Sequence, residues 1–236
     1  MRTLVVLPTY NEILNVERML RTLRTVVPET SILVVDDGSP DGTAAAAAGV
    51  ADELGSIHIL RRSEKNGLGG AYRAGFAWGI ENGFDHFVEI DCDFSHDPAA
   101  LPSLLTAAEN HDVVIGSRYV AGGMIPQWSL SRRLLSRGGN MYASVLLGLR
   151  VSDSTAGYRV YSKRALELID YGNVTADGYG FQIEMTYRAR RAGASITELP
   201  ISFTDREHGE SKMSSAIVVE ALALVTKWAA LRVVGR

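Results

Sequence analysis

Cysteine is almost absent from this chain of 236 residues, and the one that occurs, Cys92, can form no disulfide within the chain. Uninterrupted apolar runs of the ~18 residues needed for a membrane-spanning helix are also absent. The short apolar stretch at the start meets Pro8 too soon for the apolar region of a signal peptide, so we expect it to form the first core strand. These absences fit a reducing compartment, and we expect a cytoplasmic protein.

A large excess of charge is likewise missing. The formal net charge is −3, which argues against a nucleic-acid-binding protein. Acidic residues are unevenly distributed, because residues 113–152 contain no Asp or Glu. The arginines of that segment are Arg118, Arg132, Arg133, Arg137 and Arg150. In an acidic protein such a segment indicates an anionic partner, and a solvated helix face is the alternative interpretation.

The sequence does contain a regular alternation of short apolar runs and helical patterns, which weakens in its second half. The predicted strands are Thr3–Leu7, Ser31–Val35, Ile57–Leu60, Phe87–Ile90 and Val113–Ile115. The predicted helices are Asn15–Thr25, Thr43–Leu54, Gly69–Ile80 and Pro98–Glu109. This alternation predicts an α/β fold, in which a mostly parallel, Rossmann-like sheet is flanked by helices within one domain, residues 1–236.

Two aspartates follow the second predicted strand. Asp36 and Asp37 begin the segment Asp-Asp-Gly-Ser-Pro-Asp-Gly-Thr at the carboxyl end of that strand, where open α/β sheets bind ligands. Carboxylates at this position can accept hydrogen bonds from a ribose or from the N–H of a base. Asp, Gly, Ser and Pro are also turn residues, so a plain strand–turn–helix connection is the alternative. The paired aspartates favour the functional interpretation.

A second acidic cluster, with Asp91 and Asp93, follows the fourth predicted strand. Twist at a strand end can turn both carboxylates toward one ligand. Hard oxygen ligands beside a diphosphate are a normal setting for Mg²⁺ or Mn²⁺, which would neutralise a departing diphosphate. We interpret Cys92 as a small core side chain, because nearby negative charge raises the pKa of a thiol. His96 is interpreted as a turn residue or a neighbour of the metal ligands.

Three motifs come in one order along the chain: Pro8-Thr9-Tyr10-Asn11-Glu12 after the first predicted strand, Asp36–Thr43 after the second, and then Asp91–Asp93. This combination resembles the family 2 glycosyltransferases of the GT-A fold. Further segments resemble, within that family, the polyprenol-phosphate (dolichol-phosphate) mannose synthases. These segments are Asn66–Gly69, Gly116–Tyr119, Asp153–Arg159, Gly178–Glu184 and Asp205–Met213. The resemblance covers nearly the whole chain.

The resemblance implies roles for individual residues. The donor-binding residues would be Pro8, Tyr10, Glu12, Val35, Asp37, Asp91, Cys92, Asp93, Arg206 and Lys212. The ligands of Mg²⁺ or Mn²⁺ would be Asp91, Asp93 and Ser95, the last at a position where Gln can be a ligand in relatives. The acceptor phosphate would contact Arg118, Arg132 and Ser136, and the adjacent Arg133 leaves the register of this assignment open. Residues 1–112 would form a nucleotide-sugar half and residues 113–215 an acceptor half.

The reaction implied by the resemblance is an inverting transfer of mannose from GDP-mannose to a polyprenyl phosphate. The alternative donor is UDP-glucose or another nucleotide sugar. A phosphate monoester with a second pKa of about 6 is largely dianionic near neutrality, so it can attack without a general base. Catalysis then consists of positioning and charge stabilisation, with Asp91, Asp93 and Arg118 as the catalytic residues.

Other functions fit the sequence less well. A transferase acting on a neutral sugar acceptor would need a catalytic base and no arginine-rich segment. A non-catalytic sensor of nucleotide sugars would not need both Asp91 and Asp93. A dinucleotide-binding oxidoreductase would need a Gly-x-Gly-x-x-Gly motif after the first strand, and the sequence has none there.

Two segments, residues 128–149 and 214–234, combine apolar residues with basic ones. Each could lie at a membrane interface with its basic groups near lipid phosphates, and the second is predicted to be an amphipathic C-terminal helix. The alternative is that both are core-facing helices. We expect a peripheral protein at the cytoplasmic face of the membrane, bound directly or through a separate membrane protein.

Overall fold

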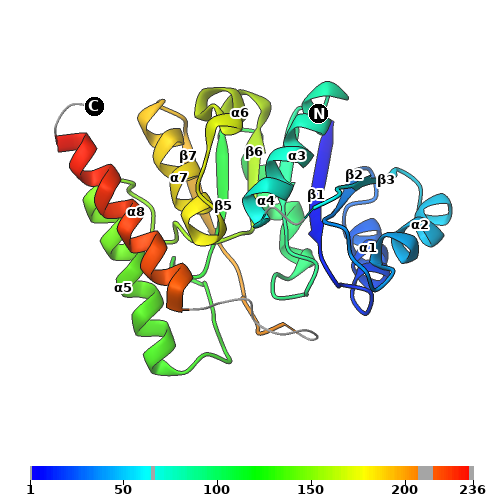
Figure 1. Cartoon of the computed structure of the whole chain (residues 1–236), viewed down its shortest axis with the longest axis horizontal. Helices are drawn as coiled ribbons and strands as arrows, with labels where there is room; N and C mark the ends of the chain where they lie inside the picture. Colours follow the sequence, from blue (N-terminus) through cyan, green and yellow to red (C-terminus); the bar gives the residue numbers. More distant parts are fainter. Residues whose placement is uncertain (1, 65–66, 207–214, 234–236) are drawn as a thin grey trace.

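The computed structural model describes residues 2–64, 67–206 and 215–233, and within these residues a seven-stranded sheet forms the centre (Figure 1). The strands lie in the order β3-β2-β1-β4-β6-β5-β7. Their bounds are Thr3–Thr9 (β1), Ser31–Asp36 (β2), Ile57–Arg61 (β3), His86–Glu89 (β4), Val113–Ser117 (β5), Arg159–Ser162 (β6) and Ile196–Pro200 (β7). Strand β6 runs antiparallel to β4 and β5, and the other pairs are parallel. The predicted fold class is therefore confirmed.

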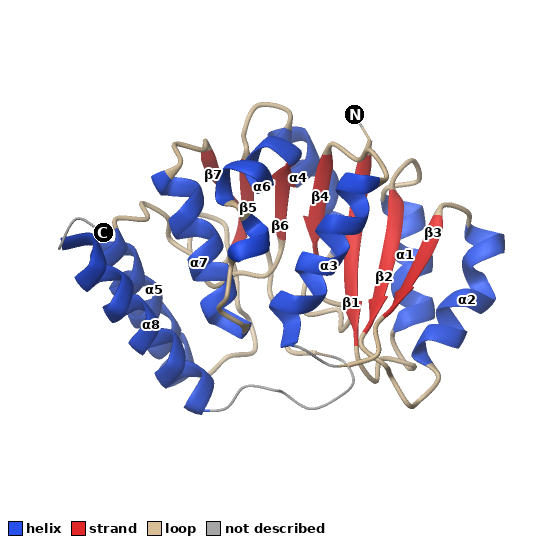
Figure 2. Ribbon diagram, turned by 45° about the horizontal axis from the view of Figure 1, so that its top comes forward, coloured by secondary structure: helices blue, strands red, loops and turns tan. Residues whose placement is uncertain are grey.

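Helices cover both faces of the sheet (Figure 2). In β1, Leu4 and Val6 pack on one face, whereas Val5 and Leu7 pack on the other, as the two-residue period of a strand requires. The face of Val5 is covered by α1 (Val16–Val26), α2 (Thr43–Leu54) and α4 (Leu101–Ala108). The face of Leu4 is covered by α3 (Gly67–Glu81), α6 (Lys163–Ile169) and α7 (Gly178–Arg191). All four side chains are fully buried, so this strand lies between two apolar cores.

Two further helices, α5 (Leu130–Leu147) and α8 (Ser215–Val233), lie side by side beyond α7 (Figure 1). The hydroxyls of Tyr142 and Thr226 lie 2.8 Å apart and link them. Helix α5 buries few apolar side chains and leaves a large apolar surface exposed. Its most exposed apolar residues are Leu130, Leu134, Leu135, Met141 and Val145. In the described part of the chain, no helix combines the length and the hydropathy that crossing a membrane requires.

The predicted strands coincide with β1 to β5 within two residues at each end, and the first three predicted helices coincide with α1 to α3 to the same extent. The prediction of one helix over Pro98–Glu109 is wrong in detail. Residues Pro98–Ala100 form a 3₁₀ turn, and the α-helix begins at Leu101. Pro102 explains the difference, because it has no N–H to donate to the carbonyl of Pro98 in a continuous α-helix.

Candidate active site

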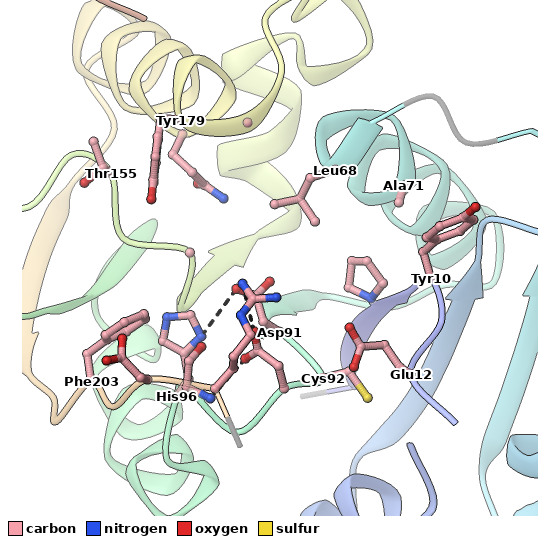
Figure 3. A pocket seen from close by; sticks show the side chains of 18 of the residues that line it. Tyr10, Glu12, Leu68, Ala71, Asp91, Cys92, His96, Thr155, Tyr179 and Phe203 are labelled. Atoms are coloured by element: carbon pink, nitrogen blue, oxygen red, sulfur yellow. Dashed lines mark hydrogen bonds and ion pairs between the residues drawn. The ribbon is translucent and has the colours of Figure 1, made fainter. Parts of the chain in front are cut away.

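A cleft of about 670 Å³ opens at the carboxyl ends of β1, β2 and β4 (Figure 3). In an open α/β sheet this edge is where ligands bind. Tyr10 and Glu12 lie on one side of the cleft, and Thr155 and Phe203 lie on the other. The cleft brings together most of the site residues predicted from the sequence. They are Pro8, Tyr10, Glu12, Asp37, Asp91, Cys92, Asp93, Ser95, Arg118, Arg132 and Arg206.

The two adjacent aspartates after β2 have different environments. The carboxylate of Asp36 accepts hydrogen bonds from the Thr9 hydroxyl at 3.0 Å and from the backbone N–H of Ser39 at 3.0 Å, so it fixes the loop. Asp37 lines the cleft instead, and Arg62 Nη1 lies 2.7 Å from its Oδ1. Val35 is fully buried in the sheet and is not among the residues that line the cleft. Of this segment, Asp37 is the residue placed to meet a ligand.

The segment after β4 turns sharply at Phe94, which lies between Asp93 and Ser95. Phe94 has a φ of +60°, in the left-handed region that a bulky residue rarely adopts. Its ring lies under the guanidinium of Arg18, with 4.2 Å from Cζ to the ring centroid, which holds it in place. After this turn, the backbone N–H of Ser95 donates a 3.0 Å hydrogen bond to Asp93 Oδ1. The turn at Phe94 therefore places the Ser95 N–H where it holds the Asp93 carboxylate.

Carboxylate oxygens at this turn are suited to a divalent cation. Asp91 and Asp93 both line the cleft, and Arg206 Nη2 lies 3.4 Å from Asp93 Oδ2. Nowhere among the described residues do three or more His, Cys, Asp or Glu side chains form a group able to hold a metal ion. Two carboxylates that leave the remaining positions to phosphate oxygens and water are the usual protein contribution to a Mg²⁺ site, so the residues present fit such an ion. Ser95 is buried beside them and also lines the cleft.

Cys92 lies between the two aspartates in sequence and His96 follows them, and both side chains are buried. Burial, with the carboxylates of Glu12 and Asp93 nearby, raises the pKa of the Cys92 thiol well above its ordinary value. Cys92 is 3% exposed and packs as a small side chain in the wall of the cleft, and a raised pKa makes a thiol a poor nucleophile. Burial also lowers the pKa of His96 to about 4, so its imidazole is neutral near pH 7. The ring of His96 packs against Tyr158, with centroids 5.3 Å apart, and against Phe203, with centroids 5.2 Å apart.

Arg118 enters the cleft from the end of β5 and is held by Asp153. Its Nε lies 2.7 Å from Asp153 Oδ2, its Nη2 lies 2.6 Å from Oδ1, and Nη2 also donates to the Thr155 hydroxyl at 2.8 Å. Burial by itself lowers the pKa of Arg118, but the Asp153 carboxylate outweighs burial and raises it, so the guanidinium stays charged. The rings of Trp128 and Phe203 lie 5.6 and 5.4 Å from its Cζ. Arg118 is therefore a fixed cation with aromatic rings around it.

A second, smaller cavity of about 90 Å³ adjoins the cleft at Arg118 and Arg132. It lies between α5, α7 and α8, and its walls are mainly apolar. The lining includes Leu135, Ser136, Ile183, Leu222 and Val225. The predicted acceptor residue Ser136 therefore lines this cavity and not the cleft. Its hydroxyl accepts a 2.7 Å hydrogen bond from the hydroxyl of Tyr119. Lys212 lies outside the described residues.

The two adjacent arginines on α5 have different contacts. Arg132 lines both cavities, with its Cζ 3.9 Å from the centroid of the Trp128 ring. Its Nη1 and the indole N–H of Trp128 both donate to Asp205 Oδ1, each at 3.1 Å. Arg133 points elsewhere, because its Nη2 donates to the carbonyl of Ile125 at 2.6 Å. Arg132 is therefore the arginine of this pair that faces the cleft.

The sequence did not single out Asp177 as a site residue. Its Oδ1 accepts a 2.8 Å hydrogen bond from the backbone N–H of Gly69, which joins the start of α7 to the start of α3 in the wall of the cleft. Gly67 has a φ of +71°, and a Cβ at this position would overlap the Asp177 carboxylate. The glycine-rich segment 67–70 is a local signal of such close approach, but the residue that it approaches is far away in sequence.

Comparison with known proteins places this geometry in context. The family model described as glycosyl transferase family 2 matches residues 4–169. The chain is 51% identical over 228 residues to an undecaprenyl-phosphate mannosyltransferase of Micrococcus luteus, covering 97% of this chain and 94% of that one. It is 47% identical over 233 residues to a polyprenol monophosphomannose synthase of Mycolicibacterium smegmatis, covering 96% of this chain and 86% of that one.

Solved structures share the fold at lower identity. Glucosyl-3-phosphoglycerate synthase from Mycobacterium tuberculosis, in complex with Mn²⁺, UDP and glucosyl-3-phosphoglycerate, aligns with a TM-score of 0.70 at 20% identity, over 97% of this chain and 80% of that one. A mannosyltransferase from Pyrobaculum calidifontis, in complex with GDP-Man and Mn²⁺, aligns with a TM-score of 0.59 at 15% identity, over 100% of this chain and 76% of that one. At these identities the likeness concerns the fold alone.

Proposed function

Because this chain belongs to glycosyltransferase family 2, we propose that it transfers mannose from GDP-mannose to the phosphate of a polyprenyl lipid, with inversion at the anomeric carbon. It is a glycosyltransferase by family. The observation that carries the choice of acceptor is the junction of two cavities at Arg118 and Arg132. One cavity is lined by carboxylates and suits a nucleotide sugar, whereas the other is apolar and suits the start of a lipid chain. The cations at their junction suit a phosphate.

On the donor side, Tyr10, Glu12 and Asp37 line the part of the cleft assigned to the nucleotide. Asp91 and Asp93 would hold Mg²⁺ or Mn²⁺ at the diphosphate, where the ion would neutralise the charge of the leaving group. Arg206, which lies close to Asp93, can donate hydrogen bonds to the same phosphates. A stabilised leaving group needs no general acid.

On the acceptor side, the two arginines have different roles. Arg118 is fixed by a fully buried carboxylate and supplies a cation of constant position. Arg132 is paired with Asp205, and both side chains are substantially exposed, at 37% and 47%. Exposed ion pairs are weak, so Arg132 can exchange Asp205 for a phosphate dianion. The dianion attacks the anomeric carbon from the face opposite the nucleotide and requires no base.

The exposed apolar side of α5 would place the acceptor cavity at a membrane surface. Leu134 and Val145 are 62% and 73% exposed. An exposed apolar cluster of this kind marks an interaction site, and a helix with apolar and basic residues suits a bilayer interface. The protein would therefore meet its lipid as a peripheral protein.

A transfer assay with a short polyprenyl phosphate tests the activity. GDP-mannose should give a β-linked mannosyl lipid by NMR, chelator should abolish transfer, and Mg²⁺ or Mn²⁺ should restore it. Asp93→Ala should remove transfer while the protein stays folded. Transfer from UDP-glucose in preference to GDP-mannose would favour the alternative donor, and transfer to a soluble sugar alone would refute the lipid acceptor.

Sedimentation with anionic liposomes tests the membrane contact. Leu134→Glu and Val145→Glu should each reduce the bound fraction, because a charge then faces the interface. The matched control is Leu168→Glu, because Leu168 is an exposed leucine on α6 and lies on neither α5 nor α8. Equal binding by all three variants would contradict direct contact through α5 and would favour a separate membrane protein as the recruiter.

A further inference from the structure

The imidazole of His96 contributes a buried polar atom to the cleft that has no hydrogen-bond partner among the described residues. This atom is Nδ1, and it lies 3.8 Å from Asp91 Oδ2 (Figure 3). The ring is 2% exposed, so water does not readily satisfy the nitrogen. A buried polar group without a partner costs on the order of 1–3 kcal/mol, and such groups concentrate at functional sites.

Of the two side chains, His96 is the fixed one. Its ring is packed between Tyr158 and Phe203, and its backbone forms a bridge with Phe203. The side chain of Asp91 is 33% exposed at the surface of the cleft. Its Oδ1 lies 3.5 Å from the Tyr72 hydroxyl, at the outer limit of a hydrogen bond. The distance from Nδ1 to Asp91 Oδ2 exceeds a normal hydrogen bond by only about 1 Å, so a small rotation of the carboxylate would close it.

We propose that His96 is a positioning residue for Asp91, whose Oδ2 accepts a hydrogen bond from Nδ1–H when the carboxylate turns to bind a divalent cation. This inference rests on the proposed function, since it requires the cation site at Asp91 and Asp93. Carboxylates that bind metals are commonly held by such a second hydrogen bond, which fixes the free oxygen. The buried nitrogen without a partner would then gain its hydrogen bond when the divalent cation binds.

The ring packing fixes the direction of this donor. The contacts with Tyr158 and Phe203 keep Nδ1 directed at Asp91. An arginine or lysine at the same place would compete with the metal for the negative charge of the carboxylate.

Mn²⁺ affinity measured with GDP present, by the EPR signal of free Mn²⁺, tests the proposal without requiring turnover. His96→Leu should weaken binding roughly 10- to 100-fold, the loss typical of a group that orients a metal ligand. His96→Asn, whose amide N–H falls near the Nδ1 position, should retain affinity close to wild type. His96→Gln, whose amide falls near Nε2, should bind as weakly as His96→Leu.

The control is Tyr158→Phe, which keeps the ring against His96 and removes a hydroxyl that also lacks a partner among the described residues. It should leave Mn²⁺ affinity unchanged. Wild-type affinity in folded His96→Leu would overturn the positioning role, as would equal affinities of the Asn and Gln variants if the Leu variant fails to fold. A ¹⁴N coupling to bound Mn²⁺ that His96→Leu removes would make His96 a direct ligand instead. No Mn²⁺ binding by the wild type would refute the cation site itself.

Discussion

Arg118 and Asp153 form an ion pair in which both side chains are inaccessible to solvent, at 5% and 0% exposure. Removal of Asp153 leaves a buried guanidinium with no compensating charge. Asp153→Ala should therefore lower the free energy of unfolding by about 3–5 kcal/mol, measured by urea denaturation at pH 7. Glu53→Ala, which removes a fully exposed partner of Arg21, should leave the urea midpoint close to wild type.

The same pair predicts acid sensitivity. Burial raises the pKa of Asp153, but the Arg118 guanidinium outweighs it and holds the pKa below the ordinary 3.8. A depressed folded-state pKa contributes stability above the unfolded value and loses it as pH falls below about 4. Asp153→Asn should therefore be less stable than wild type at pH 7, and the difference should narrow as pH falls toward 3. A constant difference across this range would contradict the assignment.

Glu89 predicts the opposite dependence on pH. It is fully buried on β4, and burial raises its pKa to about 8, although Arg159 and the amide of Gln182 partly offset this effect. A folded-state pKa raised above 4.5 gives stability that is complete below 4.5 and is lost as pH rises toward 8. Relative to wild type, Glu89→Gln should become progressively more stable from pH 5 to pH 8. Parallel stability profiles for the two proteins would refute the shift.

Arg132 and Arg133 form a matched pair for testing acceptor binding. Arg132→Ala should raise the KM for polyprenyl phosphate roughly 10- to 100-fold, as loss of a hydrogen bond to a charged group implies, and should leave GDP affinity unchanged. Arg133→Ala should lower the melting temperature, because its carbonyl contacts to Ile125 and Pro126 are lost, and should leave the KM near wild type. The reverse result would assign the phosphate to Arg133.

Gly67 should tolerate no side chain while Asp177 is present. Gly67→Ala places a Cβ in a left-handed backbone, which costs about 1–2 kcal/mol, and also displaces the Asp177 carboxylate. The loss of stability should be smaller in an Asp177→Ala background, where only the backbone cost remains. Urea denaturation of both single variants and the double variant measures this coupling. Strictly additive losses would show that the carboxylate does not occupy that space in solution.

The first half of the fold could be predicted from the sequence because β1 to β5 are short apolar runs between helical patterns. Strand β6 could not, since it begins with Arg159, a charged residue that is fully buried. Its guanidinium donates to oxygens of Ser154, Ala156, Tyr161, Gln182 and Thr186, which assemble only in the folded protein. Strand β7 is only half-buried and has no apolar alternation.

The candidate site could be predicted in outline, because motifs at strand ends locate the cleft. Its finer assignments depend on contacts across long sequence separations. The sequence could not separate Arg132 from Arg133, since both lie on α5 and differ only in their distant partners. Arg132 contacts Asp205 and Trp128, whereas Arg133 donates to the carbonyl of Ile125. It could not direct the His96 nitrogen toward Asp91, because the packing of Tyr158 and Phe203 sets that direction.

The reversed direction of β6 has a consequence for how the cleft is built. In a parallel sheet, only the carboxyl ends of the strands lie at this edge. A wholly parallel sheet would therefore supply the cleft only with residues that follow strands. Because β6 runs the other way, the chain arrives at β6 along the same edge where it leaves β5. A residue just after β5 and one just before β6, 35 positions apart, thereby become neighbours as Arg118 and Asp153. One inverted strand thus gives the cleft its anchored cation at Arg118.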